Sequence, residues 1–222
     1  MTTPRSPDDL LRLLELRLSH ERLASYVTEA GGDLNDGLHL YTWNTEMSGA
    51  MWEDLGLVEV LLRNTVDHQL ATRYTNRGYP GSWFANAGRE LPRPAQQDIA
   101  VARSRLTRQG KLATHGQMVS AMTFGFWRYF FSRRYTNLWP DIASGFPYAP
   151  DRALKTLEAP IDRLHKFRNR IGHHQRIWAE PLGARHQDML NVVGYIDPRL
   201  ANWLSTTSRF HVLHAARPLA NQ

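Results

Sequence analysis

The chain has 222 residues, enough to bury a core without cross-links, and it contains no cysteine. Disulfides, thiol catalysis and cysteine-based metal sites are therefore excluded. The formal net charge of +6 and the pI of about 9.9 favour an anionic partner. Nearly all basic residues are arginine, which contacts phosphate at two points, and the only lysines are Lys111, Lys155 and Lys166.

The N-terminal stretch is charged throughout and lacks the apolar run of a signal peptide. No window reaches the apolar length of a membrane span. We therefore expect an intracellular, cytoplasmic protein that does not engage a membrane. We also expect residues 1–222 to form a single domain, with a loose tail at 1–7 and a weakly specified tail at 209–222.

Apolar residues recur at helical spacing along most of the chain. No segment alternates with period two over a useful length, so the sequence predicts an all-α fold. Helices are expected at residues 8–29, 44–75, 95–109, 117–133, from 151 past 171, 184–195 and 198–204. Connections are expected at residues 33–43, 76–94 and 136–150.

The segment 161–178, IDRLHKFRNRIGHHQRIW, combines a double histidine with several basic residues on a helical pattern. At about 100° per residue, its buried stripe is Leu157, Leu164 and Ile171. His173 falls on the opposite side, together with Asp162, His165 and Asn169. Pro160 predicts a kink or restart of the helix, and Gly172 is expected to end or distort it.

This polar face has the parts for cleaving RNA without a metal. The His173 imidazole titrates near neutrality and can move protons, and the Arg168 guanidinium can stabilise charge on a phosphate. RNA supplies a 2′-hydroxyl that can attack the adjacent phosphate, which DNA lacks. Asn169, one turn before His173, is placed to hydrogen-bond the ring, whereas His174 is expected at the edge of the buried face. Such a reaction needs an acid and a base, which a two-fold dimer of this helix would supply.

The spacing of Arg168 and His173 is weak evidence by itself, because several other Arg/His pairs in this basic chain match a loose form of it. Earlier in the chain, Glu59 and Arg63 lie four residues apart on a predicted helix. From the pattern alone, a structural ion pair is favoured over a role in the site.

The stretch 168–178, RNRIGHHQRIW, resembles the signature of the Abi-like (abortive infection) branch of the HEPN superfamily. Three further stretches are similar to that branch and occur in its order: LHLYTWN at 38–44, LVEVLLRNTVDHQL at 57–70 and MTFGFWRYFFSRRYTNLW at 122–139. The resemblance implies a HEPN-like helical bundle with additional helices. It also implies a metal-independent endoribonuclease of a phage-defence or toxin system, without a cofactor.

The resemblance further implies a homodimer with its active site at the interface, with RNA as substrate and an antitoxin or regulatory RNA as a conceivable neutralising partner. Its catalytic residues fall on Arg168 and His173, with Asn169 as the following polar residue. Glu59 and Arg63 match a second polar position on an earlier helix, so with His174 they are expected to support the site. Lys166, Arg170 and Arg176 are the expected RNA contacts. Gly172 stands where the family often has another small residue such as alanine.

Other interpretations stay open at this point. A catalytically inactive HEPN module could use the same basic face to bind RNA or a protein partner. A metal site of His173, His174 and His186 is disfavoured, because adjacent histidines on one helix chelate poorly. A DNA-binding regulator is also disfavoured, because the sequence shows no helix-turn-helix pattern.

Overall fold

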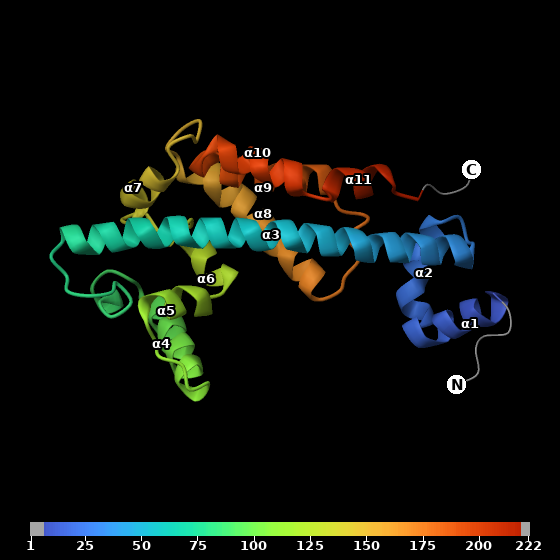
Figure 1. Cartoon of the computed structure of the whole chain (residues 1–222), viewed down its shortest axis with the longest axis horizontal. Coiled ribbons are helices and arrows are strands. Elements are labelled where there is room, and N and C mark those ends of the chain that lie inside the picture. Colours follow the sequence, from blue (N-terminus) through green and yellow to red (C-terminus); the bar gives the residue numbers. More distant parts are fainter. Residues whose placement is uncertain (1–6, 219–222) are drawn as a thin grey trace. The chain divides into compact units, whose positions relative to one another are not determined.

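The computed structural model describes residues 7–218 and shows α-helices, short 3-10 helices and no strand in that range (Figure 1). The prediction of an all-α fold is confirmed. Residues 1–6 of the expected N-terminal tail and residues 219–222 lie outside the described range. Contacts divide the chain into two compact units, and the prediction of a single domain stays a prediction. The first unit comprises residues up to 52, 176–180 and 208 onward; the second comprises residues 53–175 and 181–207.

The first unit contains α1 (Pro7–Leu18), α2 (His20–Glu29), the beginning of α3 (Leu34–Asn76) and α11 (Phe210–Ala215). The prediction of one helix ending at Glu29 is wrong, because Ser19 interrupts it with a φ of 74°. The Ser19 hydroxyl accepts a hydrogen bond from the Arg22 backbone N–H and so caps α2. The tail expected beyond residue 209 contains the short helix α11, so that prediction is wrong for residues 210–215.

Residues 33–43 do not form the predicted connection, because α3 already begins at Leu34. The Asp33 carboxylate accepts the Asp36 backbone N–H at 2.9 Å and caps the helix. A Cβ atom at Gly37 would lie 2.9 Å from the Val27 Cα atom, so glycine allows α2 and α3 to pack closely.

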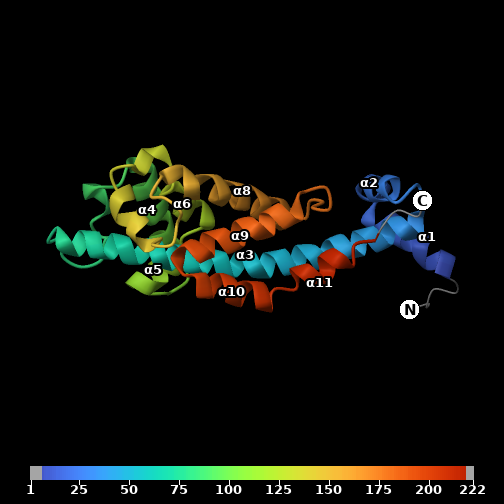
Figure 2. The same cartoon turned by 90° about the horizontal axis from the view of Figure 1, so that it is seen from above.

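The second unit is built around the remainder of α3, with α8 (Leu154–Gly172), α9 (Leu182–Ile196) and α10 (Pro198–Thr207). α9 lies against both α8 and α10, as two views show (Figures 1 and 2). Arg163 of α8 donates two hydrogen bonds to the Asp188 carboxylate of α9, at 2.8 and 2.6 Å. Apolar residues that recur at helical spacing along α3 are buried in this unit, at Leu55, Val58, Leu62, Val66 and Leu70.

The same unit contains α4 (Arg93–Arg108), α5 (His115–Ala121), α6 (Phe124–Tyr129) and α7 (Trp139–Ile142). Its 3-10 helices are η1 (Ala87–Arg89), η2 (Arg133–Tyr135) and η3 (Ala143–Gly145). The single apolar helix predicted at 117–133 is wrong: it divides into α5 and α6, because the Thr123 hydroxyl caps α6 by accepting the Phe126 N–H. Tyr129, at the end of α6, is 47% exposed.

The start of α8 also differs from its prediction. The helix begins at Leu154, and Asp151 lies outside it, accepting hydrogen bonds from the Ala153 N–H and the Thr156 hydroxyl. These bonds lower the pKa of Asp151. Pro160 is buried inside an uninterrupted helix, so the helix does not restart there. Among residues 7–218, no helix is both long and apolar enough to cross a bilayer.

Candidate active site

The end of α8 presents the double histidine. α8 stops at Gly172, and His174 adopts a left-handed conformation with a φ of 52°. Two hydrogen bonds close the helix: the His174 N–H donates to Ile171 O and the Gln175 N–H to Arg170 O, both at 2.9 Å. This pattern is a Schellman motif, whose left-handed position is usually glycine. Gly172 therefore ends the helix as expected, but His174 carries the unusual backbone conformation.

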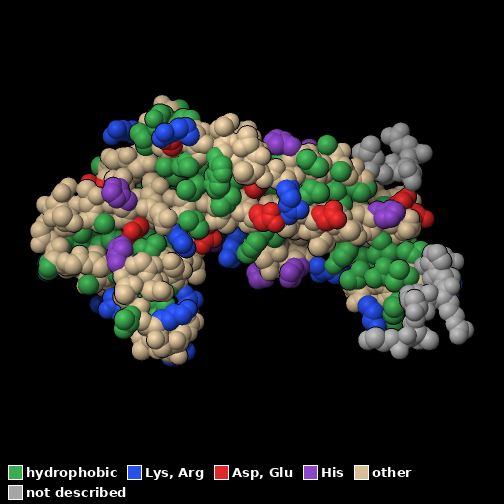
Figure 3. Space-filling model, in the orientation of Figure 1, with side chains coloured by type: hydrophobic (Ala, Val, Ile, Leu, Met, Phe, Trp, Pro, Cys, Tyr) green, Lys and Arg blue, Asp and Glu red, His purple; other side chains and the backbone are tan. Residues whose placement is uncertain are grey.

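This helix end exposes both histidines. Figure 3 shows histidine side chains together at the surface near the end of α8. The prediction that His173 points away from the core of its own helix is confirmed. The prediction that His174 lies at the edge of the buried face is wrong, because the left-handed turn takes it out of the helical repeat.

Arg168 and Asn169 lie one turn earlier and are both half-buried. The hydrogen bond found between Asn169 and His173 runs from the His173 backbone N–H to the Asn169 carbonyl, at 3.0 Å. The expected side-chain bond from Asn169 to the imidazole is not formed among the described residues. The His173 ring is therefore not oriented by Asn169 in this structure.

Glu59 of α3 lies close enough to Arg168 of α8, and to Arg63 on its own helix, for their charges to interact. Glu59 is half-buried, and burial raises its pKa, while the charges of Arg168 and Arg63 counteract this rise. The Arg63 Nε atom is buried, and no hydrogen-bond partner is found for it among the described residues. The two polar positions that the sequence linked only by resemblance therefore face one another across α3 and α8.

The three expected RNA contacts have different surroundings. Lys166 is exposed and forms an ion pair with Asp162 at 2.7 Å, so part of its charge is already neutralised. Arg170 is half-buried. Arg176 is exposed and belongs to the first unit, where its guanidinium lies 5.8 Å from the centre of the Trp178 ring.

His165 is a residue that the sequence analysis placed on the polar face but not in the site. It precedes Arg168 by three residues and Asn169 by four, so it shares their side of α8. The ring is half-buried beside Phe124, with a centroid separation of 5.8 Å. Burial lowers the pKa of His165, and the nearby Arg128 charge lowers it further. The four-residue spacing of His165, Asn169 and His173 was the sequence feature that could have placed His165 in the site.

The position of His165 also explains why α6, a helix rich in aromatic residues, contains Gly125. A Cβ atom at Gly125 would lie 3.4 Å from the His165 Nε2 atom. A neighbour from another helix therefore packs closely at Gly125. The close approach of α6 to α8 is what buries the His165 ring.

His186, the third member of the alternative metal site, has a different environment from the double histidine. It is 3% exposed, and its Nε2 atom lies 4.0 Å from an Asp54 carboxylate oxygen. Residues 7–218 contain no group of three or more His, Asp or Glu side chains arranged to hold a metal ion. The three histidines are therefore not assembled as that interpretation requires.

Two other motif stretches meet inside the first unit. The buried Asn44 side-chain oxygen accepts the backbone N–H groups of Ile177 and Trp178, at 2.8 and 3.1 Å. Asn44 ends the stretch 38–44, and the other two residues end the stretch 168–178. This contact gives both stretches a structural role, because Asn44 satisfies two backbone donors.

The model of the family described as Abi-like protein matches residues 14–179. No curated protein and no solved structure is similar enough to match.

Proposed function

This chain belongs to the Abi-like protein family, and from that premise we propose that it is a phage-defence endoribonuclease that cleaves RNA without a metal ion. The observation that carries the proposal is the end of α8. An exposed imidazole, His173, follows a half-buried guanidinium, Arg168, which interacts with Glu59 on a second helix. The relationship of this chain to the HEPN superfamily is part of the same proposal.

The proposed reaction is attack of a 2′-hydroxyl on the adjacent phosphate. His173 transfers a proton, either from the attacking hydroxyl or to the departing 5′-oxygen. Arg168 stabilises the negative charge that develops on the phosphate oxygens. The products are a 2′,3′-cyclic phosphate and a free 5′-hydroxyl, so no water and no cofactor enter this step.

The other residues of the proposed site hold the RNA or the catalytic pair. Glu59 restrains the Arg168 guanidinium through charge, and Arg63 interacts with the same carboxylate. Asn169 accepts the His173 backbone N–H one turn earlier, and His174 follows the catalytic histidine directly, so both support the position of its backbone. Lys166, Arg170 and Arg176 contact the phosphate backbone.

The reaction uses an acid and a base, and a homodimer supplies both. One chain contributes one proposed catalytic histidine, His173, and a two-fold axis would place the same residue of the second protomer opposite it. The site would then lie at the interface. A neutralising antitoxin or regulatory RNA would act by covering this face.

The test is RNA cleavage by the purified protein in the presence of a metal chelator. Arg168→Ala and His173→Ala should each lower the cleavage rate by about 10²–10⁴-fold and abolish toxicity in cells. His68→Ala is the matched control, because His68 is an exposed histidine that also follows an arginine at similar spacing. Full cleavage by both site variants would contradict the proposal.

The competing function is an inactive RNA-binding module. It predicts salt-sensitive RNA binding by the wild-type protein but no cleavage under any condition. The basic composition favours RNA binding in both cases. Product analysis, rather than binding, therefore separates the two.

A further inference from the structure

Three polar side chains from separate segments meet in the second unit. Asp67 lies on α3, Ser82 in the loop after α3, and His115 at the first residue of α5. The Ser82 Oγ atom lies 2.8 Å from His115 Nδ1, and His115 Nε2 lies 3.0 Å from an Asp67 carboxylate oxygen. The hydroxyl, imidazole and carboxylate therefore form a continuous hydrogen-bonded series. Proteins that activate a serine nucleophile arrange these three groups in the same order.

Two neighbouring N–H groups donate further hydrogen bonds to Asp67 and Ser82. The Trp83 indole N–H donates to the other Asp67 carboxylate oxygen at 2.8 Å. The Phe84 backbone N–H donates to Ser82 Oγ at 3.2 Å. Because the Asp67 carboxylate only accepts, His115 Nε2–H donates to it, and in the neutral imidazole Nδ1 then accepts the Ser82 hydroxyl proton. The nitrogen that faces the hydroxyl is therefore the basic one.

The series is open to small molecules at the imidazole end. The His115 side chain is 38% exposed and Ser82 is half-buried, whereas the Asp67 carboxylate is only 18% exposed. A carboxylate shielded behind an accessible imidazole and hydroxyl is the arrangement that general-base activation requires. The Phe84 N–H is also placed to stabilise charge on Oγ as its proton leaves.

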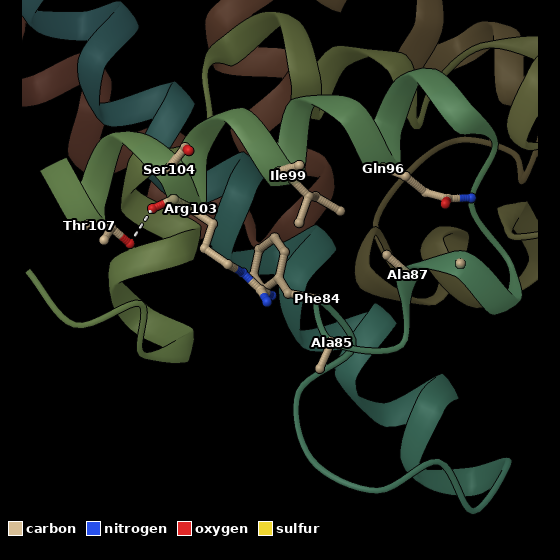
Figure 4. A pocket seen from close by; sticks show the side chains of 10 residues that line it. Phe84, Ala85, Ala87, Gln96, Ile99, Arg103, Ser104 and Thr107 are labelled. Atoms are coloured by element: carbon tan, nitrogen blue, oxygen red, sulfur yellow. Dashed lines mark hydrogen bonds between the residues drawn. The ribbon is translucent and has the colours of Figure 1, made fainter.

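A pocket of about 430 Å³ lies between the loop after α3 and α4, and its link to the series is Phe84, since Ser82, His115 and Asp67 do not line it. Phe84 and Ala85, which follow Ser82 closely, form one wall, and the Phe84 ring lies 5.5 Å from the His115 ring. Figure 4 shows Ile99 and Arg103 on the opposite wall, with the Arg103 side chain extending from α4 toward Phe84. The pocket suits a small molecule with an apolar body and an anionic group.

We propose that Ser82, His115 and Asp67 form a hydrolytic site for small carboxylic esters that carry an anionic group. Ser82 Oγ attacks the ester carbonyl carbon while its proton passes to His115 Nδ1. The carbon–oxygen bond to the alcohol then breaks, and the alcohol leaves with that proton. Water, deprotonated by His115, attacks the acyl-serine, and Ser82 recovers its proton as the carboxylic acid departs. Asp67 holds the imidazole and stabilises its protonated form.

The first test uses a fluorophosphonate probe, which forms a phosphorus–oxygen bond with an activated serine and releases fluoride. In the folded wild-type protein, mass spectrometry should find Ser82 labelled at least about 100-fold faster than Ser120. Ser120 is a suitable internal control because it is exposed on the same short helix as His115. The difference should disappear in urea. Equal labelling in the folded protein would show that the network is structural only and would overturn the proposal.

The second test measures hydrolysis of 4-nitrophenyl hemisuccinate and 4-nitrophenyl butyrate. Ser82→Ala and His115→Gln should abolish both activities, and Ser120→Ala should leave them unchanged, with circular dichroism checking each fold. Arg103→Ala should raise KM for the anionic ester and leave KM for the neutral one unchanged. Undiminished hydrolysis by folded Ser82→Ala protein would overturn the proposal. Neither test involves RNA, so its outcome is independent of the proposed ribonuclease function.

Discussion

Two histidines of the second unit, His115 and His173, are held in different ways. Both ring nitrogens of His115 lie within hydrogen-bond distance of side chains, those of Ser82 and Asp67. The described residues provide no hydrogen bond to the His173 ring, which is exposed beyond the last turn of α8. Side chains of the same chain therefore orient the His115 ring, whereas no described side chain orients the His173 ring by a hydrogen bond. This difference fits the proposal of an interface site at α8.

The largest expected effect separates activity from stability at His173. His173→Asn should lower RNA cleavage by about 10²–10⁴-fold, because the proton-transfer group is lost. The free energy of unfolding should change by less than about 0.5 kcal/mol, because the side chain is exposed. Cleavage assays and urea unfolding of the same preparation measure both quantities. A large loss of stability would mean that His173 acts mainly in the fold.

The opposite pattern is expected around His115. Asp67→Ala removes the acceptor of the buried Trp83 indole and of the His115 ring, so it should cost about 1–3 kcal/mol of unfolding free energy. Asp98→Ala, at an exposed aspartate of α4, is the control and should stay within about 0.5 kcal/mol. Similar urea midpoints for the two variants would contradict the described network.

The helix end gives a third prediction, on backbone conformation. His174→Gly should stabilise the protein by about 1 kcal/mol, because a side chain is unfavourable at a φ of 52°. His173→Gly should instead destabilise it by about 0.5–1 kcal/mol, because His173 has an ordinary φ of −96° and glycine gains only unfolded-state entropy there. Thermal unfolding compares the two neighbours directly. Equal shifts would mean that His174 is not left-handed in solution.

The smallest expected effect concerns pH. The pKa of His165 is lowered from 6.5 in the folded protein, so the unfolded chain binds a proton more readily. Stability should therefore fall as the pH decreases through about 6.5 and level off once the folded-state group is protonated. His165→Gln should reduce this fall between pH 7.5 and 5.5. An unchanged pH dependence in the variant would contradict the assignment.

Local pattern was sufficient to predict several parts of the fold. The buried stripes of α3 and α8 follow from helical spacing, because each apolar face packs along one side of the helix. The end of α9 and the start of α10 were also predicted closely, since Pro198 begins α10 directly after Asp197. The face on which His173 lies was correct for the same reason.

The wrong helix boundaries and the wrong position of His174 arose where one backbone angle or one helix cap determines the local structure. Ser19 divides a periodic helix through a positive φ, and the Thr123 cap divides an apolar one. The side chain of His174 left the predicted face because of its φ of 52°. Helical spacing carries no information about any of these local choices.

Side-chain contacts between segments far apart in the sequence could not be predicted from the local pattern. Ser82 and His115 meet Asp67 only because the loop after α3 and the start of α5 fold back onto α3. The interaction of Glu59 with Arg168 was suggested by resemblance and not by pattern. Such contacts depend on tertiary packing, which a single sequence does not specify residue by residue.

The chemistry of cleavage tests the central claim most directly. An RNA carrying one 2′-deoxynucleotide at the cleaved position should be incubated with wild-type protein and a metal chelator, beside the all-ribose RNA. The account predicts a 2′,3′-cyclic phosphate end from the all-ribose RNA and no cleavage at the deoxy position. Cleavage at the deoxy position, or a requirement for added metal, would contradict it.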